Sequence, residues 1–383
     1  MDTAYQWQTN TIRTATDVNT GKPVPSDTSE DKESCPDCSV GQFKCYKGTP
    51  NDREGHYYRR QPLSETSEVV RMHYNSRKNN TRKLRQSSPI IALRSFNNWV
   101  KTVLIHIVLE MYSARGKIVQ YVLDLAGGKG GDLGKWNKAF IRHLVLIDVA
   151  SSSVEHALER YNDMNEPSFS AEFVVSDCGK PGLASYLSKL PFFFDVVSCQ
   201  FALHYFFESE ERTKTFMNHV SSKLSPGGFF FCTFPDARVI EERMKSGRNR
   251  FGNEIYEVFF DDENVQFKKF GTKYTFKLKD AVDCIPEYVV DLETLKELAA
   301  DRDMDLVYEA NFQEFFESNK CTELGEPLLF RMNVSPDIRY VDPISWEMAT
   351  FYCTAIFQKR SDCEIFQPGV RKISKDEIVI IED

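Results

Sequence analysis

Five short apolar segments, separated by helical patterns, constrain the fold of this chain more than any other feature. Near-continuous apolar runs that alternate with helices are typical of parallel strands covered on both faces. We therefore predict an α/β fold with a doubly wound, mostly parallel sheet. The segments are "QYVLDLA" (120–126), "HLVLIDV" (143–149), "AEFVVSD" (171–177), "FDVVSCQF" (194–201) and "GFFFCTF" (228–234).

Polar residues stand at the ends of three of these strands, namely Asp148, Asp177 and Gln200. Ligands of doubly wound sheets bind beyond the carboxyl ends of the strands. The three side chains therefore predict a binding site along one rim of the sheet.

A glycine-rich turn follows the first strand, within "VLDLAGGKGGDLGKW" (122–136). Glycines there let the backbone approach a ligand closely. The carboxylate of Asp148, about twenty residues further on, could accept both hydroxyls of a ribose. This pattern fits a dinucleotide or S-adenosylmethionine equally well, and a tight structural turn is the alternative.

The later strands favour S-adenosylmethionine. His204 and Tyr205 follow the fourth strand, and "LSPGGFFFCTFP" places a Pro-Gly-Gly turn before the fifth. With Asp177 placed where it could hold an adenine amino group, residues 120–235 resemble the S-adenosylmethionine-dependent methyltransferases.

More specific motifs occur in a fixed order along residues 70–360. Together they resemble the mRNA cap guanine-N7 methyltransferases. The resemblance implies a Rossmann-like class I methyltransferase fold and methyl transfer from S-adenosylmethionine to N7 of the cap guanine. It implies S-adenosylhomocysteine as product and no metal. Beside the glycine-rich turn and "LSPGGFFFCTFP", the motifs are "HYN" (73–75), "SFNNWVK" (95–101), "DVASSSVEHALERY" (148–161), "CQFALHY" (199–205), "IPEYVVDLETLKELA" (285–299) and "WEMATFYCTAIFQK" (346–359).

The same resemblance assigns roles to individual residues. Those matching cofactor positions are Lys101, Ala126, Asp148, Asp177, Gln200 and Tyr205. Those matching positions around the cap and its phosphates are Asn97, Asn98, Lys129, Lys135, Arg160, His204, Glu287 and Tyr352. No residue is assigned as a general base, because N7 of guanine carries a lone pair and no proton. For Tyr352, which lies in an apolar strand, an ordinary core role is the alternative.

One residue departs from the family pattern. The glycine-rich turn of the family begins with Gly, where this chain has Ala126, and the next position, usually Cys, is Gly127. A methyl group at a position with positive φ costs about 1 kcal/mol or more, whereas at negative φ it is harmless.

The outer segments differ in composition from the core. Residues 1–62 are polar and without a sustained period, so we expect a disordered tail before a methyltransferase domain at 63–383. Within that domain, 120–235 is the predicted cofactor core and 236–290 an inserted lid. The tail holds Cys35, Cys38 and Cys45, which do not complete a zinc pattern and are expected to be free thiols.

Residues 71–94 carry seven Arg or Lys and no acid, although the whole chain has a net charge of −8. The segment could be a linker, a nuclear import signal or an electrostatic arm for phosphates. The net charge argues against bulk non-specific nucleic-acid binding but allows a local basic groove.

Length and composition set wider bounds. The 383 residues are 41% hydrophobic, enough for a sizeable core, and the ten Cys show no disulfide spacing. Without a bilayer-spanning or signal segment we expect a soluble, intracellular protein with no membrane partner. The resemblance implies capped RNA (GpppN-RNA) as substrate and a nuclear location. It leaves open a capping guanylyltransferase, RNA polymerase II or a small activating subunit as partner.

Three other functions remain as alternatives. A small-molecule methyltransferase would share residues 120–235 but give no role to the basic segment, the paired Asn residues or Glu287. A catalytically silent cap-binding scaffold would explain Ala126. An NAD-linked oxidoreductase fits only the first two strands.

Overall fold

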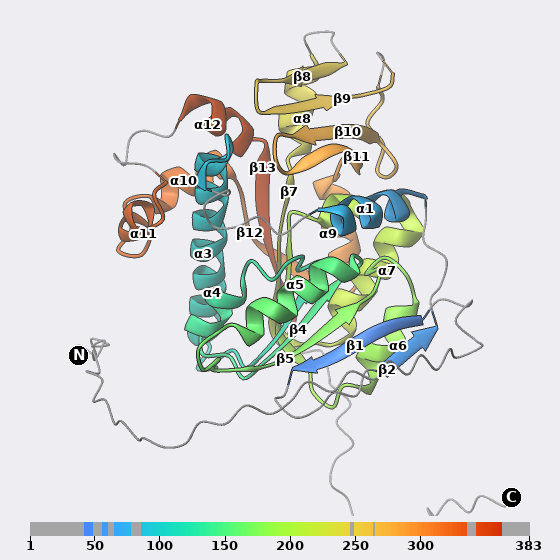
Figure 1. Cartoon of the computed structure of the whole chain (residues 1–383), viewed down its shortest axis with the longest axis vertical. Coiled ribbons are helices and arrows are strands. Elements are labelled where there is room, and N and C mark those ends of the chain that lie inside the picture. The colour runs from blue at the N-terminus through green and yellow to red at the C-terminus, as the bar shows by residue number, and fades with distance from the viewer. Residues whose placement is uncertain are drawn as a thin grey trace, which may run out of the picture. The chain divides into compact units, whose positions relative to one another are not determined.

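The central sheet of the computed structural model has nine strands in the order β12-β13-β7-β6-β3-β4-β5-β1-β2. Several of these strands and most of the helices are labelled in Figure 1. The five strands from β7 to β5 pair in parallel, and the strands that flank them pair antiparallel. The strands are β1 (Gln42–Gly48), β2 (His56–Arg59), β3 (Tyr121–Leu125), β4 (His143–Asp148), β5 (Ser170–Val175), β6 (Phe194–Gln200), β7 (Leu224–Pro235), β12 (Met304–Asn311) and β13 (Tyr352–Lys359).

The structure describes residues 42–48, 56–59, 65–77, 86–245, 249–262, 265–334 and 342–361, all within the unit Val40–Asp383. Its helices are α1 (Glu65–Ser76), α3 (Ile91–Ser113), α4 (Leu133–Lys138), α5 (Ser151–Asn162), α6 (Gly182–Lys189), the 3₁₀ turn η1 (Leu203–Tyr205), α7 (Glu210–Ser222), α8 (Ala237–Met244), α9 (Leu292–Ala300), α10 (Phe312–Asn319), α11 (Gly325–Arg331) and α12 (Pro343–Ala349).

Alternate residues of the central strands enter two separate hydrophobic cores, as the period of two along a strand requires. Val122 of β3 packs into one core and its neighbour Leu123 into the other. Phe231 and Phe230 of β7 divide in the same way. The first core includes residues of α3, α5 and α10, and the second includes residues of α6, α7 and α9. Helices therefore cover both faces, and the predicted doubly wound, mostly parallel α/β fold is confirmed.

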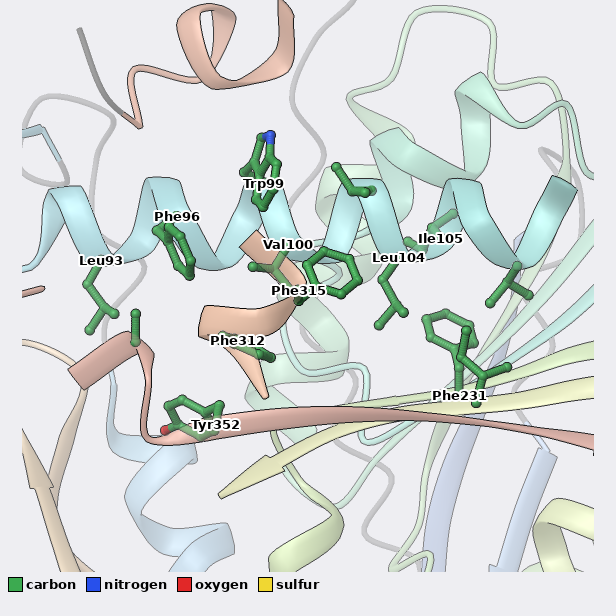
Figure 2. Packing of buried hydrophobic residues seen from close by; sticks show 14 of the residues in the cluster. Leu93, Phe96, Trp99, Val100, Leu104, Ile105, Phe231, Phe312, Phe315 and Tyr352 are labelled. Atoms are coloured by element: carbon green, nitrogen blue, oxygen red, sulfur yellow. The ribbon is translucent and has the colours of Figure 1, made fainter. Parts of the chain in front are cut away.

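Helix α3 is fixed by aromatic packing in the first core (Figure 2). The ring of Phe96 lies 6.3 Å from that of Phe312 in α10. Phe312 in turn lies 5.8 Å from Tyr352 of β13. The nearby Trp99 donates its indole N–H to the carbonyl of Gly325 at 2.9 Å. This anchorage positions the polar residues of the same helix, which the sequence assigns to the site.

A second sheet has four antiparallel strands in the order β11-β10-β9-β8. They are β8 (Arg250–Gly252), β9 (Tyr256–Phe259), β10 (Lys273–Leu278) and β11 (Val282–Tyr288). With α8, they occupy the segment 236–290 that the sequence suggests as an inserted lid. Their closing role stays a prediction.

Two strands, at 42–48 and 56–59, lie within the segment that the sequence predicts to be a disordered tail. Strand β1 pairs with β5, with Cys45 opposite Val174, and β2 pairs with β1. Without β1, strand β5 would be the edge of the sheet, and its unpaired backbone groups favour a further strand. Such pairing is a long-range contact that tail composition does not encode. The rest of the predicted tail, including Cys35 and Cys38, lies outside the described residues.

The basic segment 71–94 is partly structural. Its first residues belong to α1 and its last residues to α3, whereas 78–85 lie outside the described part of the chain. Arg77 donates to the backbone carbonyls of Asp280 and Ala281, at the turn between β10 and β11. Arg94 donates to the Asp280 carbonyl at 2.8 Å. Two of its cations therefore hold a turn of the second sheet.

Candidate functional site

A cavity of about 250 Å³ opens at the carboxyl ends of the parallel strands, where the order reverses between β3 and its neighbours β4 and β6. Such switch points are the usual ligand sites of doubly wound sheets. All six residues that the sequence assigns to the cofactor line this cavity. They are Lys101, Ala126, Asp148, Asp177, Gln200 and Tyr205.

The glycine-rich turn forms one wall of the cavity. Ala126, directly after β3, has φ of +56°, so the left-handed conformation considered from the sequence is present. At Gly127 a side chain has no room, because a Cβ there would lie 2.7 Å from Cγ of Leu146. At Gly128 a Cβ would meet nothing within 4 Å, but φ is +55°. A small residue is therefore required at 127 by packing and at 128 by the backbone conformation.

Asp148 ends β4 and is bound by two backbone amides. Its Oδ2 accepts from the N–H of Gly128 and its Oδ1 from that of Ala150, both at 2.9 Å. A carboxylate has about four lone-pair sites, so acceptor capacity remains beside these two bonds. Burial raises the pKa of Asp148 to about 6, against the opposing effect of these amides.

Asp177 lies just beyond β5 and is held by an arginine that the sequence reasoning missed. The guanidinium of Arg212 in α7 donates to both carboxylate oxygens at 2.8 and 2.9 Å. The N–H of Gly179 also donates to Oδ1 at 2.8 Å. Both side chains are buried, and Arg212 itself lines the cavity. A signal existed, because Arg212 shares a helical face with the apolar Phe216 four residues later.

Asp132 connects residues of the two predicted sets. Its Oδ2 accepts from Lys101 at 2.8 Å and its Oδ1 from Lys135 at 2.6 Å. Lys135 also donates to Oδ1 of Asn98 at 2.6 Å. Although burial favours the protonated acid, the two lysines hold the pKa of Asp132 well below its usual range. Asp132 belongs to the glycine-rich motif, but the sequence reasoning gave it no role.

Gln200 ends β6 at the cavity and is held by neighbouring strands. Its amide oxygen accepts from the Thr233 hydroxyl at 3.3 Å, and its Nε2 donates to Ser198 at 3.4 Å. Phe201, the next residue, has φ of +58°, a second left-handed residue at this rim.

Cations gather on the outer side of the glycine-rich turn. Lys129 donates to the carbonyl of Arg77 at 2.9 Å, and Arg160 of α5 donates to that of Gly130 at 3.1 Å. Burial, and then the charges of Arg77 and Arg160, lower the pKa of Lys129. The positive charges of these side chains give this part of the surface a local potential that attracts anions. Arg77 was part of the basic segment but not of the predicted site.

Glu287 and His204 form a second buried polar group. The Glu287 side chain is on β11 and 2% exposed, and its Oε2 accepts from the Tyr274 hydroxyl at 2.8 Å. Nε2 of His204 lies 3.4 Å from Oε1 of Glu287, an ion-pair distance without hydrogen-bond geometry. Both ring nitrogens of His204 are buried without a hydrogen-bond partner among the described residues.

Two tyrosines that line the cavity are linked to this polar group. Tyr74 and Tyr205 line the cavity, and their hydroxyls are 3.2 Å apart. Burial, with a further contribution from the Glu287 charge, raises the pKa of Tyr74 to about 12. The rings of Tyr205 and His204 are 4.2 Å apart. The charge of Glu287 therefore acts on both tyrosines that line the cavity.

Tyr352 and Asn97 complete the predicted cap set. Tyr352 packs edge-on against Phe201 with 4.9 Å between ring centroids, so most of its ring belongs to the core. Asn97, beside Asn98 on α3, has a buried side-chain oxygen without a hydrogen-bond partner in the described structure. The eight predicted cap residues thus lie in several clusters, and none of them lines the cofactor cavity.

Comparison with known proteins decides among the alternatives. Residues 58–360 match the model of the mRNA (guanine-N(7))-methyltransferase domain. The chain belongs to this family. The mRNA cap guanine-N(7) methyltransferase 1 of Oryza sativa subsp. japonica is 39% identical, over 80% of this chain and 84% of that protein. The mRNA cap guanine-N(7) methyltransferase of Schizosaccharomyces pombe is 38% identical, over 81% and 88%.

Membership of this family shows that the protein is a cap methyltransferase, an enzyme that uses S-adenosylmethionine. Solved structures are less similar. An S-adenosylmethionine-dependent methyltransferase from Clostridium acetobutylicum is 14% identical, with a TM-score of 0.42, over 69% of this chain and 92% of that one. The assignment therefore rests on the sequence comparisons.

The cavity of this cap methyltransferase fits a nucleoside with an amino-acid tail. The carboxylate of Asp148 is of the type that accepts from ribose hydroxyls, and the cation of Lys101 beside Asp132 is of the type that suits a carboxylate and an amine. Among the described residues, no helix could span a membrane and no cluster of three potential metal ligands occurs.

Proposed function

We propose that this cap methyltransferase holds S-adenosylmethionine in the cavity and the cap guanine against Glu287, on the far side of Tyr74 and Tyr205. The observation that carries the proposal is the buried pair of Glu287 and His204. The carboxylate is 2% exposed, and neither ring nitrogen of the histidine has a hydrogen-bond partner among the described residues. Polar groups buried in this way carry a free-energy cost. A polar ligand would supply what these atoms lack.

Guanine has the complementary edge. Its N1–H and exocyclic amino group are adjacent donors, and its O6 is the acceptor beside them. The carboxylate of Glu287 can accept from the two donors, and a ring N–H of His204 can donate to O6. Adenine offers no such set of groups. The pair therefore supports recognition of guanine over adenine.

The proposed mechanism relies on positioning and electrostatics. When bound, S-adenosylmethionine supplies a methyl group on a positively charged sulfur. The chain orients N7 of guanine toward that methyl group, and orientation of two reactants can contribute ~7–11 kcal/mol. The negative charge of Glu287 stabilises the cationic ring that methylation produces. Because N7 carries no proton, no residue has to act as a base.

The triphosphate is assigned to the cations outside the glycine-rich turn. Lys129 and Arg160 lie beside Arg77, and this cluster supports a phosphate chain leaving the guanine. Lys135, held by Asp132 and Asn98, stands on the neighbouring α4 and could take a phosphate or ribose oxygen. Tyr352 and Asn97 are proposed to contact the guanosine.

The primary test identifies the methylated atom. The protein is incubated with GpppG-capped RNA and labelled S-adenosylmethionine, and the digested cap is analysed. Label on N7 of the terminal guanine is expected. Binding of cofactor and cap without turnover would instead support a scaffold, and label elsewhere would contradict the assignment.

Glu287→Gln tests the guanine site directly. The amide replaces one acceptor by donors that face donors, so the transition state should lose roughly 2–4 kcal/mol of stabilisation. This lowers kcat/KM on the capped RNA about thirty-fold to nearly a thousand-fold. Affinity for S-adenosylhomocysteine should barely change in the same preparation. A loss explained wholly by cofactor affinity would show that Glu287 does not read guanine.

We further propose that the protein works in the nucleus, because capping belongs to mRNA processing. A fluorescent fusion of the whole chain tests this, and exclusion from the nucleus would contradict it. A capping guanylyltransferase, RNA polymerase II or a small activating subunit are the candidate partners. Co-purification with the tagged whole chain tests each of them.

A further inference from the structure

Tyr274 and Glu287 face each other across two strands of the second sheet. They are directly opposed in the register of β10 and β11, so their side chains project from the same face. The Tyr274 hydroxyl donates to Oε2 of Glu287 at 2.8 Å. Tyr274 is 1% exposed and Glu287 2%. Because both side chains are buried, water does not compete for this hydrogen bond, and the bond can orient the carboxylate strongly.

The bond restrains the one torsion of glutamate that packing controls least. Rotation about the bond to the carboxyl group is broad for Glu, because it joins an sp³ and an sp² carbon. Donation to Oε2 restrains rotation of the carboxylate and leaves Oε1 toward His204, whose Nε2 lies 3.4 Å away. Each oxygen still has a lone pair for a further donor.

We propose that Tyr274 is a positioning residue for guanine recognition: its hydroxyl sets the carboxylate plane of Glu287 so that both oxygens can accept from N1–H and the exocyclic amino group of the cap guanine. The inference rests on the proposed function of Glu287. Two parallel hydrogen bonds need a fixed plane, whereas one hydrogen bond tolerates rotation. Tyr274 should therefore matter more for the second bond than for the first.

Hypoxanthine separates the two bonds. It keeps N1–H and O6 of guanine but lacks the exocyclic amino group, so an inosine cap can form only one hydrogen bond with Glu287. For the unmodified protein we expect kcat/KM to be roughly ten- to hundredfold lower on IpppG-capped RNA than on GpppG-capped RNA. The ratio of the two values measures the second bond.

Tyr274→Phe removes only the hydroxyl and keeps the ring in the core. We expect kcat/KM on the guanine cap to fall about tenfold and that on the inosine cap about two- to threefold, so that the ratio shrinks. Affinity for S-adenosylhomocysteine should not change. Tyr186→Phe is the matched control, because Tyr186 donates to the buried carboxylate of Glu172 at 2.5 Å, a pair outside the site. The control should retain both rates and their ratio.

The outcomes distinguish this inference from the function on which it rests. If Tyr274→Phe leaves the guanine-to-inosine ratio unchanged, whether or not both rates fall, Tyr274 is structural and the inference is wrong. Glu287→Gln is measured on the same pair of caps. If Glu287→Gln also keeps the ratio of the unmodified protein, the role of Glu287 itself is wrong. If Glu287→Gln loses the ratio and Tyr274→Phe does not, only the inference fails.

Discussion

At position 126 the chain keeps a backbone conformation that its side chain does not favour. Ala126 has φ of +56°, next to Gly127, which has no room for a side chain beside Leu146. The chain therefore has a methyl group at the strained position and only a hydrogen at the crowded one. The space at 127 is explained by Leu146, but nothing in the structure explains Ala126.

The first prediction follows from that strain. Ala126→Gly should raise the free energy of unfolding by up to about 1 kcal/mol, because Gly adopts positive φ without penalty while its greater unfolded-state entropy offsets part of the gain. Ala157→Gly, at a buried position of α5, should instead lower it by about 1 kcal/mol or more. Urea unfolding of both variants gives the comparison. An Ala126→Gly variant less stable than the original chain would contradict the argument.

The second prediction concerns pH. If Asp148 binds the ribose hydroxyls as proposed, the ionised carboxylate is the better acceptor, and burial raises its pKa to about 6. Protonation below that pH replaces an acceptor by a donor. Affinity for S-adenosylhomocysteine should therefore be constant above about pH 7 and decline as the pH falls below about 6. Calorimetric titration across this range checks it.

Asp148→Asn supplies the control for this titration. An amide does not ionise, so the variant should bind weakly at every pH, without the decline below pH 6. The buried Asp124 is a second candidate, since burial and the charge of Asp132 raise its pKa to about 7. A decline that persists in Asp148→Asn would assign the titration to Asp124 instead.

Residues at strand ends could be predicted, and residues that hold them could not. Asp148 and Gln200 were found because the apolar runs of β4 and β6 stop at them. Arg212 and Tyr274 act through contacts made across the fold, from α7 to β5 and from β10 to β11. A single sequence records the side chain but not its distant partner.

At the scale of elements, the turn between β10 and β11 is held by the basic segment. Ser88 donates to the carboxylate of Asp280 at 2.9 Å, and Arg77 and Arg94 bind its backbone carbonyl. The hairpin that carries Tyr274 and Glu287 is thereby attached to the chain leading into α3. The basic composition of this segment suggested an arm for phosphates, and a single sequence does not show that these cations bind a carbonyl about two hundred residues away.

The third prediction separates cations that bind RNA from cations that bind the hairpin. Lys129→Gln and Arg160→Gln should each reduce the salt slope of capped-RNA binding by about one, if each contacts a phosphate. Arg94→Gln, which loses a bond to a backbone carbonyl, should leave the slope unchanged. Binding titrations from low to high salt measure the slopes. If Arg94→Gln instead gives the largest change in salt slope, the prediction is wrong and the basic segment binds phosphates.

The elements themselves were predicted unevenly. The five parallel strands were predicted because both of their faces are buried, which makes the apolar runs nearly continuous. Strand β7 begins at Leu224 rather than 228, because the Pro-Gly-Gly turn is already within the strand. Strands β1 and β2 were missed because they depend on pairing with β5 more than on their own composition.

At the scale of the whole molecule, the charge at one rim is opposite in sign to the net charge of the chain. The chain has a net charge of −8, yet Lys129, Arg160 and Arg77 lie together at one rim. An acidic remainder limits non-specific binding of nucleic acid, while the local cations retain attraction for a phosphate chain. The net charge predicts weak non-specific binding of nucleic acid, but only the fold shows that the three cations lie near one another.

The fourth prediction follows from β1 lying against the outer side of β5. The family match starts at residue 58, so a chain trimmed to that match loses β1 and part of β2 and bares a long strand edge. Bare edges recruit strands from other molecules, and the result is aggregation. Deleting residues 1–60 should therefore lower solubility and give concentration-dependent association in sedimentation velocity, whereas deleting 1–39 should do neither. Equal behaviour of the two shortened chains would mean that β1 does not protect the sheet from its neighbours in solution.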